Sequence, residues 1–330
     1  MASLIGRQPY PQHILAPFRC LFLRSSSHVY SVATKIPKVK RIVLDAWSFC
    51  SYNNSMNRLS IDERAQVITA LMEGVGVNAT QRLTGVCKPA ILKLLAEVGR
   101  ACARLHDERV RGLSPSRVEC DEVWSFVFCK EKTVRPEYRG TCGIGDCWLW
   151  TGIDSVSKLI IGYHVGRRTP DDAHAFMLDL AGRITNITTL ATDGLASYPD
   201  AVREAFGDFV NYGMVVKVFD AEPAGEARYS PPKCVGCQKR AVIGAPRGRD
   251  LSTSIVERSN LTLRSTNKRF ARLTLGHSKK LANHAHSIAI TMAYYNWCRP
   301  HLSLKGKTPA QASGLADHKW DVADLVRFAD

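Results

Sequence analysis

The chain has 330 residues, of which 45% are hydrophobic, and 45 lysines and arginines outnumber 30 acidic residues to give a net charge of +15. This length suits two or three domains with their own cores, and the hydrophobic content excludes a disordered or low-complexity chain. No run approaches the roughly eighteen consecutive apolar residues of a membrane-spanning helix, which excludes a membrane protein of that kind. Eleven cysteines at scattered spacings disfavour a secreted disulfide framework, so we expect a reduced, intracellular globular protein.

Two segments account for the whole net positive charge of the chain. Residues 1–55 carry seven lysines and arginines and one acid, and residues 251–308 carry ten and one, Glu257. A basic segment around a single carboxylate is typical of a surface that binds a polyanion such as nucleic acid. The alternative is a solvated helix face together with a charged leader.

Residues 1–55 differ from the rest of the chain. They lack helical or strand periodicity, are rich in Arg and Ser, and are poor in acids. This composition resembles an organellar transit peptide, and the segment could also come from translation upstream of the true start. Because Met56 opens a regular segment at once, we favour the second interpretation and expect 1–55 to lie outside the fold.

A helical segment follows. Ser60–Glu63 is a capping box, and the apolar residues after it recur at helical spacing. Glycines then separate a first helix, a short second helix ending near Leu83, and a third helix from about Lys88 to Leu105. A short helix, a tight turn and a longer helix form the outline of a helix-turn-helix, although many small helical bundles share it. Residues 56–112 are therefore predicted to be a helix-turn-helix DNA-binding domain.

From residue 117 onward the pattern is that of an α/β fold with an antiparallel part and parallel additions. Strands are predicted at 116–131, 147–154, 158–166, 186–194 and 212–219, and the second and third form a hairpin. Helices are predicted from Thr169 to Ile184, from Pro199 to Phe206, from Ser254 to Arg272 and from Ser278 to Trp297.

Residues 220–252 are rich in Pro and Gly and are predicted to be a long loop, which in a compact domain is usually functional or disordered. Cys234 and Cys237 in this loop are half of a structural zinc site. Cys142 and Cys147 could supply two more thiolates, but nothing in the sequence brings the pairs together. Partly buried thiols without a metal are therefore the default interpretation, and a zinc site is the alternative.

Three carboxylates carry the predicted chemistry. Asp121 lies midway along the first strand and Asp193 at the carboxyl end of the fourth, so they share one level if these strands are parallel neighbours. Glu257 lies in the first turn of the closing helix, and Arg264, two turns later, lies near the same face. Three convergent carboxylates bind Mg²⁺ or Mn²⁺, and a metal pair can activate a water or hydroxyl and stabilise the leaving oxygen of a phosphodiester. Arg264 would then bind a phosphate nearby.

Each carboxylate also has a structural alternative. Asp193 with Gly194 could form only a turn, and Asp121 could face water. Glu257 could be structural, because Ser254 to Glu257 is itself a capping box. The rivals for the roles of Asp121 and Glu257 are Glu122, Asp154, Asp250 and Glu226.

Five sequence runs resemble those of bacterial insertion-sequence transposases, and the nearest group is the DDE transposases of the insertion sequence 1 family. The runs are VECDEVWSF, LATDG, YSPPKCVGC, TSIVERSNLTLRSTNKRFARLT and YYNWCRPH followed by KTPA. The resemblance extends from about Met56 to the C-terminus. It implies a ribonuclease H-like α/β catalytic domain at 113–310, with five mixed strands in the order 3-2-1-4-5, after the helix-turn-helix domain. Residues 311–330 would be a helical tail.

The resemblance also implies metal-dependent DNA strand cleavage and joining at terminal inverted repeats. Asp121, Asp193 and Glu257 match the metal-binding triad, with Mg²⁺ or Mn²⁺ as cofactor, and Arg264 matches the basic residue on the helix of the glutamate. In one respect the chain departs from the pattern. Asp193 and Glu257 are separated by 63 residues, more than in the family's best-known member, so no role can be carried over to the insert at 220–252.

Basic side chains outside the triad are expected to contact DNA phosphates, which position DNA without specifying its sequence. They are Lys88, Lys93, Lys268, Arg269, Arg272, Lys279, Lys280 and Arg299, although Arg299 could only cap a helix end. Two DNA ends must be cut together, so we expect at least a homodimer on double-stranded DNA, in the bacterial cytoplasm at the nucleoid. The alternatives are a DNA-binding regulator with an inert nuclease-like domain and a nuclease without joining activity.

Overall fold

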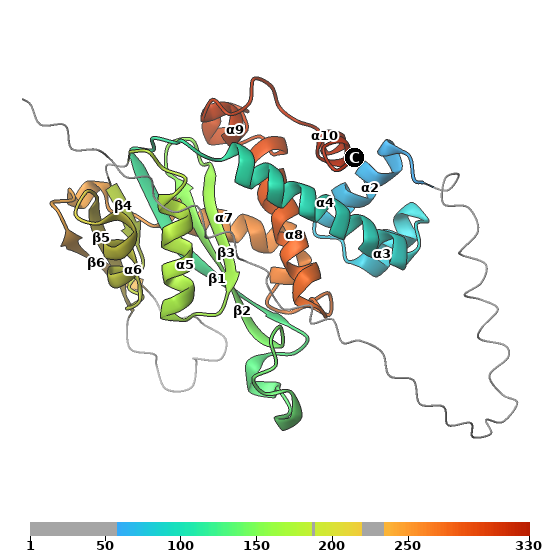
Figure 1. Cartoon of the computed structure of the whole chain (residues 1–330), viewed down its shortest axis with the longest axis horizontal. Helices are drawn as coiled ribbons and strands as arrows, with labels where there is room; N and C mark the ends of the chain where they lie inside the picture. The colour runs from blue at the N-terminus through green and yellow to red at the C-terminus, as the bar shows by residue number, and fades with distance from the viewer. Residues whose placement is uncertain (1–57, 187–188, 220–233) are drawn as a thin grey trace, which may run out of the picture. The chain divides into compact units, whose positions relative to one another are not determined.

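The computed structural model describes residues 58–186, 189–219 and 234–330. Leu59–Asp330 form one compact unit, shown as the coloured ribbon in Figure 1. The predicted leader and residues 220–233 of the predicted insert lie outside the described residues. In the described ranges, no helix is long and apolar enough to cross a membrane.

The sheet of the described residues has six strands in the order β3-β2-β1-β4-β5-β6. The strands are β1 (Arg117–Val127), β2 (Gly145–Asp154), β3 (Ile160–Gly166), β4 (Thr189–Thr192), β5 (Asn211–Phe219) and β6 (Cys234–Ile243). The first three form an antiparallel meander, and the turn between β2 and β3 lies where the hairpin was predicted. β4 pairs parallel with β1, β5 pairs parallel with β4, and β6 runs antiparallel to β5.

The predicted order of the first five strands is confirmed, but the predicted number of strands is wrong. Residues 234–243, assigned from the sequence to a loop, form the sixth strand at the edge of the sheet. The prolines of the segment lie outside these ten residues, so every residue of β6 keeps the backbone N–H that a strand needs. Without β6, the backbone groups along β5 would lack a partner on that side.

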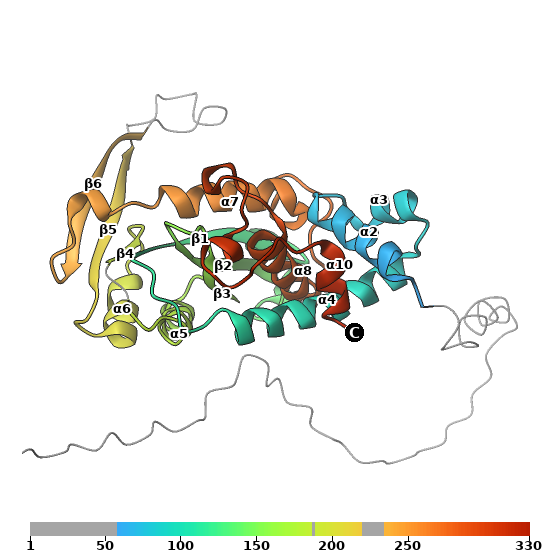
Figure 2. The same ribbon diagram turned by 90° about the horizontal axis from the view of Figure 1, so that it is seen from above.

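Helices lie on both faces of the sheet. They are α2 (Ile61–Met72), α3 (Val77–Thr84), α4 (Lys88–Arg109), α5 (Pro170–Ala181), α6 (Tyr198–Phe206), α7 (Ser254–Thr266), α8 (Leu281–Ala293), α9 (Pro309–Ala312) and α10 (Val322–Arg327). Figure 2 shows α5 and α6 on one face of the sheet and α7 on the opposite face. Because side chains alternate along a strand, β1 presents Val118 and Cys120 to the face covered by α5 and α6, and Val123 to the face covered by α7.

Local sequence explains where these helices begin and end. The capping box before α2 forms as predicted, since Glu63 N donates to Ser60 Oγ and Ser60 N donates to Glu63 Oε2. Thr169 caps α5 by accepting from Asp172 N, at the predicted start. α7 ends at Thr266, earlier than predicted, and a 3-10 turn follows at Lys268–Phe270. The predicted last long helix is α8, which continues as a π-helix at Tyr294–Cys298.

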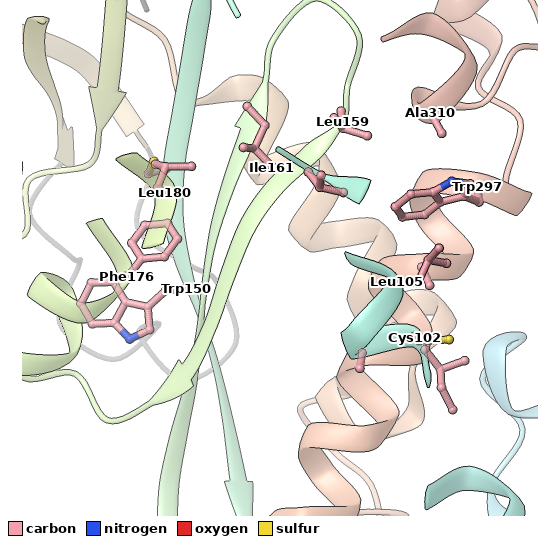
Figure 3. Close-up of a cluster of buried hydrophobic side chains, with 14 of the residues drawn as sticks. Cys102, Leu105, Trp150, Leu159, Ile161, Phe176, Leu180, Trp297 and Ala310 are labelled. Carbon is pink, nitrogen blue, oxygen red and sulfur yellow. The ribbon is translucent and has the colours of Figure 1, made fainter. Parts of the chain in front are cut away.

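α4 belongs to the core of the whole unit. It has 22 residues, extends four residues beyond its predicted end, and packs along α8 beyond β3 (Figures 1 and 2). At Gly99, an added Cβ would lie 2.5 Å from His286 Cβ, so glycine permits this close contact. Figure 3 shows one core cluster with Trp150 and Phe176 near the sheet and Leu105 near Trp297. The helical and α/β segments therefore share a core, and their functional division stays a prediction.

The C-terminal segment also joins this core. In α10, which lies in the predicted helical tail, Leu325 and Val326 are buried in the same cluster. Arg64 of α2 donates to Val326 O and to both carboxylate oxygens of Asp330. The last residues are thus held against the first described helix.

Candidate active site

The pairing of β1 with β4 brings Asp121 and Asp193 together. In the parallel register Cys120 lies opposite Thr192, so the next residue on each strand is an aspartate at the same level, as predicted. β4 ends at Thr192, which leaves this end of the sheet open. Single carboxylate oxygens of Asp121, Glu122 and Asp193 lie within 4.8 Å of one another.

Asp121 is held by two hydrogen bonds from opposite sides. Glu122 N donates to its Oδ1 over 2.8 Å, and Asn260 Nδ2, from α7, donates to its Oδ2 over 2.8 Å. Burial raises the pKa of Asp121 to about 6, and the nearby charges of Asp193 and Glu257 act in the same direction. The alternative in which Asp121 is merely a water-facing strand residue is therefore not observed.

Asp193 combines a turn contact with an electrostatic role. Its Oδ1 accepts from Leu195 N over 3.1 Å, so the predicted turn is present. Burial raises the pKa of Asp193, and the charge of Glu257 adds to this effect, while Arg168 and Lys217 oppose it. The turn thus points a partly buried carboxylate at the other acids.

Glu257 lies in the first turn of α7 and faces the same cleft. Its Oε2 lies 2.6 Å from Lys217 Nζ, and its Oε1 accepts from Thr253 Oγ1 over 2.6 Å. The capping box between Ser254 and Glu257 does not form, because the helix is capped at Thr253 without a side-chain hydrogen bond. Glu257 is thus not engaged in capping the helix.

The first N–H groups of α7 donate instead to a carboxylate from the sheet. Ile255 N and Val256 N donate to Glu119 Oε2 over 2.7 and 3.2 Å. Glu119 is fully buried, and burial raises its pKa. A sequence search could not find this pairing, because the partners lie 136 and 137 residues apart.

Of the two rivals for the role of Asp121, Glu122 is part of the acidic group and Asp154 is not. The side chain of Glu122 is only 1% exposed, and burial followed by the charge of Asp193 raises its pKa to about 7. Asp154 accepts hydrogen bonds from Val156 N and from the backbone and hydroxyl of Ser157. Its carboxylate therefore stabilises the turn between β2 and β3.

Of the two rivals for the role of Glu257, only Asp250 lies in the described part of the chain. Asp250 lies in a 3-10 turn at Gly248–Asp250 and is not among the residues that line the cleft. Glu226 lies outside the described residues.

Two basic residues that sequence reasoning missed lie between the acids. Arg168 Nη2 lies 3.2 Å from Glu122 Oε2 and 3.8 Å from Asp193 Oδ2, and its guanidinium stacks 4.9 Å from the centre of the Trp148 ring. Lys217, on β5, reaches across to Glu257. In the sequence, Arg168 and Lys217 are marked only by their position close to the end of a strand and near an acidic residue. Many surface residues share this position, so it could not identify them.

These side chains surround an open cleft of about 660 Å³. Its charged and amide-bearing lining residues are Asp121, Arg168, Asp193, Lys217, Glu257, Asn260 and Arg264. Arg264 is half-buried, and this burial lowers the pKa of its guanidinium, as does the nearby charge of Arg272. The four residues predicted to act in catalysis therefore meet in one cleft.

The residues predicted to contact DNA are divided between two surfaces. Lys88 and Lys93 are exposed at the start of α4, and Lys268, Arg272, Lys279 and Lys280 are exposed on the segment between α7 and α8. Arg299 is half-buried beyond the π-helix.

Arg269 differs from this set. It donates from Nη1 to Ser278 Oγ over 2.6 Å, and burial lowers its pKa to about 10. Its guanidinium therefore helps to hold the segment between α7 and α8 in place.

The cysteines do not gather into a metal site in the part of the chain described. Cys234 and Cys237 are exposed on β6, Cys142 is exposed, and Cys147 is buried on β2. Among the described residues, no cysteine belongs to a group of three or more potential metal ligands. The predicted zinc alternative has no support from this geometry.

No protein-family model matches the chain, and no curated protein sequence matches it. Among solved structures, the chain is similar to piggyBac transposase in a synaptic complex with hairpin DNA, with 9% identity, 86% of this chain and 74% of that chain covered, and a TM-score of 0.38. It is also similar to Mos1 transposase in a paired-end complex with the left transposon end, with 15% identity, 56% and 69% coverage and a TM-score of 0.20. Both TM-scores are too low to establish a shared fold, so what the cleft can do follows from its own residues.

Proposed function

We propose that the chain is a DNA transposase that cuts DNA at the terminal inverted repeats of an insertion sequence and joins the cut ends to target DNA. The observation that carries this proposal is the convergence of Asp121, Asp193 and Glu257 on one cleft that also contains Arg264. An antiparallel meander followed by two parallel strands, with the helix that carries Glu257 across the site, is the ribonuclease H-like arrangement implied by the sequence resemblance.

The donor set fits a hard divalent cation. It consists of carboxylate oxygens, which Mg²⁺ and Mn²⁺ prefer over nitrogen or sulfur ligands. Asp121 and Asp193 are partly buried, and burial together with nearby negative charge raises the pKa of each, so a cation would relieve this repulsion. Asp121, Asp193 and Glu257 would hold such ions, which when bound stabilise the attacking and leaving oxygens of a phosphodiester.

Neighbouring side chains orient these acids and bind the substrate. Asn260 fixes Asp121, and Thr253 fixes Glu257, each by a hydrogen bond. Arg264 lies in the cleft without a carboxylate at salt-bridge distance in the described part of the chain, and its planar guanidinium suits two oxygens of one phosphate. The exposed lysines and arginines at the start of α4 and between α7 and α8 would bind the DNA backbone on either side.

The decisive experiment is a divalent-metal cleavage assay on DNA that carries the inverted repeats flanking this reading frame. A transposase nicks the repeat ends with Mg²⁺ or Mn²⁺ and transfers the freed 3′ ends into target DNA. A regulator with an inert nuclease-like domain would bind the repeats without cutting them, and a simple nuclease would cut without joining. Light scattering on the DNA complex tests the expected homodimer or higher oligomer.

Asp193→Asn should abolish cleavage and leave DNA binding near that of the wild type. The change preserves the shape of the side chain but removes the charge that holds a divalent cation. Asp200→Asn is the matched control, because the side chain of Asp200 is 92% exposed on α6 and outside the cleft. Metal-dependent cleavage by pure Asp193→Asn protein would remove Asp193 from the site.

Glu257→Gln should stop both cleavage and strand transfer. Glutamine can still accept the hydrogen bond from Thr253, but it cannot supply an anionic ligand. The lost contact with Lys217 is a partly exposed ion pair worth roughly 1 kcal/mol or less, so thermal stability should change little. An active Glu257→Gln protein beside an inactive Asp193→Asn protein would show that the third ligand is another residue.

A further inference from the structure

Two leucines are exposed on the loop between α7 and α8, in a strongly basic part of the chain. Leu273 is 92% exposed and Leu275 is 98% exposed. Residues 258–316 contain no aspartate or glutamate. The exposed basic residues of this loop are Lys268, Arg272, Lys279 and Lys280. Single exposed leucines are common on protein surfaces, but these two, separated by one residue, form an apolar tip (residues 273–275) inside a basic surface.

The loop begins beside the acidic cleft. Arg264 lines the cleft and lies in the last turn of α7, just before the loop. Burial lowers the pKa of Arg264 and the charge of Arg272 lowers it further, so Arg272 lies near the cleft as well. Beyond the apolar tip, an added Cβ at Gly276 would lie 2.9 Å from Lys268 Cγ, so Lys268 packs against the loop there. The apolar tip therefore has a positively charged side chain on each side.

Buried contacts fix the start of the loop. Phe270 is buried in the core cluster between α7 and the sheet. Asn267 Nδ2 donates to Ser287 Oγ over 3.1 Å and to Thr291 Oγ1 over 2.9 Å, and both acceptors lie on α8. The two helices are thus joined at the point where the loop begins.

The end of the loop is fixed by a chain of hydrogen bonds whose direction can be assigned. Ser125 Oγ donates to Cys147 O, so it accepts from His284 Nε2, which lies 3.0 Å away. Burial lowers the pKa of His284 to about 3, as does the charge of Arg269, so the ring is neutral. Its Nδ1 therefore accepts from Ser278 Oγ over 2.8 Å, and Ser278 Oγ accepts from Arg269 Nη1 over 2.6 Å. The apolar tip is thus held between two fixed ends.

Duplex DNA is the partner that fits both the apolar tip and the charges around it. Proteins that bend DNA insert apolar side chains such as leucine between base pairs, while basic side chains bind the neighbouring phosphates. Insertion disrupts base stacking, so it is favoured when the inserted side chains are already held in place. The apolar tip is exposed, fixed at both ends and surrounded by cations, and its loop begins beside the cleft.

We propose that Leu273 and Leu275 insert into duplex DNA bound at the cleft and unstack a base step close to the bond that is cut. Unstacking releases the backbone at that step from the regular double helix, so that the phosphodiester can enter the cleft. The inference rests on the proposed function only in taking DNA as the partner of this surface.

The test is the fluorescence of 2-aminopurine, a base that becomes brighter when it is unstacked, placed in turn at successive base steps of a duplex. The full chain is added to one duplex that carries the inverted repeat and to one of unrelated sequence. We expect a several-fold rise in fluorescence at neighbouring steps. A rise in the repeat duplex assigns the insertion to the end that is cut, and a rise in the unrelated duplex alone assigns it to target DNA.

The double variant Leu273→Ser, Leu275→Ser should lose this rise and keep the thermal stability of the wild type, because both side chains are exposed. Phe209→Ser is the matched control. Phe209 is 95% exposed on the loop between α6 and β5, beside Asp208 and outside the basic segment. This control should therefore keep the rise.

A mismatch in the DNA separates unstacking from a merely structural role. The double variant should cut the repeat about tenfold more slowly than the wild type, because the DNA must unstack without the leucines. A mismatched base pair at the same step is easier to unstack and should restore cleavage to within about twofold of the wild type. Lys280→Gln should instead weaken binding and lower the salt slope by about one, with the rise per bound duplex unchanged.

The outcomes separate this inference from the proposed function. Wild-type protein that binds duplex DNA without a rise at any step overturns the inference and leaves the transposase proposal standing. A rise that persists in the double variant, or slow cleavage that a mismatch does not restore, also overturns the inference. A rise without cleavage overturns the proposed function alone, and absence of DNA binding overturns both. If the double variant loses only a DNA-independent dimer in sedimentation, the leucines contact a second copy of the chain and the inference is overturned.

Discussion

The N-terminus of α7 is held by a buried carboxylate from the central strand. Glu119 accepts hydrogen bonds from Ile255 N and Val256 N and is fully buried between the helix and the sheet. Glu119→Ala would leave both N–H groups without an acceptor and remove a negative charge from a helix N-terminus, where such a charge is favourable. The change should therefore loosen the helix that carries Glu257, Asn260 and Arg264.

The expected magnitude follows from the two hydrogen bonds. Each hydrogen bond to a charged group contributes roughly 1.5–3 kcal/mol, and loss of a helix cap alone costs about 1 kcal/mol. Burial raises the pKa of Glu119, which shows that lost hydration offsets part of this gain. We expect Glu119→Ala to lower the free energy of unfolding by about 2–4 kcal/mol. Glu119→Gln keeps an acceptor oxygen and loses only the charge, so its cost should be about 1 kcal/mol or less.

Urea denaturation, followed by circular dichroism and by tryptophan fluorescence, measures this difference. Coincident transitions by the two probes would justify a single free energy of unfolding for each variant. Cleavage per folded molecule should fall further in Glu119→Ala than in Glu119→Gln, because the helix is less well held. If the free energy of unfolding of Glu119→Ala lies within about 0.5 kcal/mol of the wild-type value, the reasoning is refuted. Two buried N–H groups cannot lose their acceptor at so small a cost.

Three other perturbations have defined outcomes. A protein that starts at Met56 keeps the capping box at Ser60 and should be folded and fully active; insoluble protein, or weaker DNA binding at matched salt, would contradict this. Arg264→Ala should weaken binding of the cut DNA end and flatten its salt dependence by about one phosphate contact, and an unchanged slope in a salt titration would argue against that contact. The folded-state pKa is about 6 for Asp121 and about 7 for Glu122, above the usual 3.8 and 4.5. Their protonated forms therefore contribute stability that is complete below about pH 4 and lost by about pH 7. Thermal melts of the protein in the presence of a chelator should show this loss of stability as the pH rises, and added Mg²⁺ should reverse it. Thermal stability that does not change with pH would contradict the raised pKa values.

The parts of the fold that depend on local sequence were predictable. Alternating apolar residues located β1 to β3, and cap residues located the starts of α2 and α5. Asp121 and Asp193 could be brought to one level because parallel pairing fixes the register of two strand ends. The length of α4 was underestimated because its last turn is held by tertiary contacts, among them the hydrogen bond from Arg183 to Val110 O.

The remaining features depend on long-range contacts. β6 was missed because the prolines and glycines around it dominate the composition of the segment, while its pairing with β5 can be seen only in three dimensions. Arg168 and Lys217 were missed because an ion pair across a cleft leaves no periodic signal. The long interval between Asp193 and Glu257 proves compatible with the site, because Glu119 anchors α7 directly to β1 whatever the length of the chain that leads to it.

The burial of α4 along α8 has a consequence for the spacing between the DNA bound at the start of α4 and the DNA bond that is cut. A helix of 22 residues is about 33 Å long, close to one turn of B-DNA, and no loop interrupts it between its exposed start and the core. If the start of α4 binds the DNA backbone at the repeat, as proposed, the length of α4 sets the distance between the base pairs bound there and the bond that is cut. Insertion of one or two base pairs between them should then reduce cutting at the correct position, since no hinge in this helix can absorb the change.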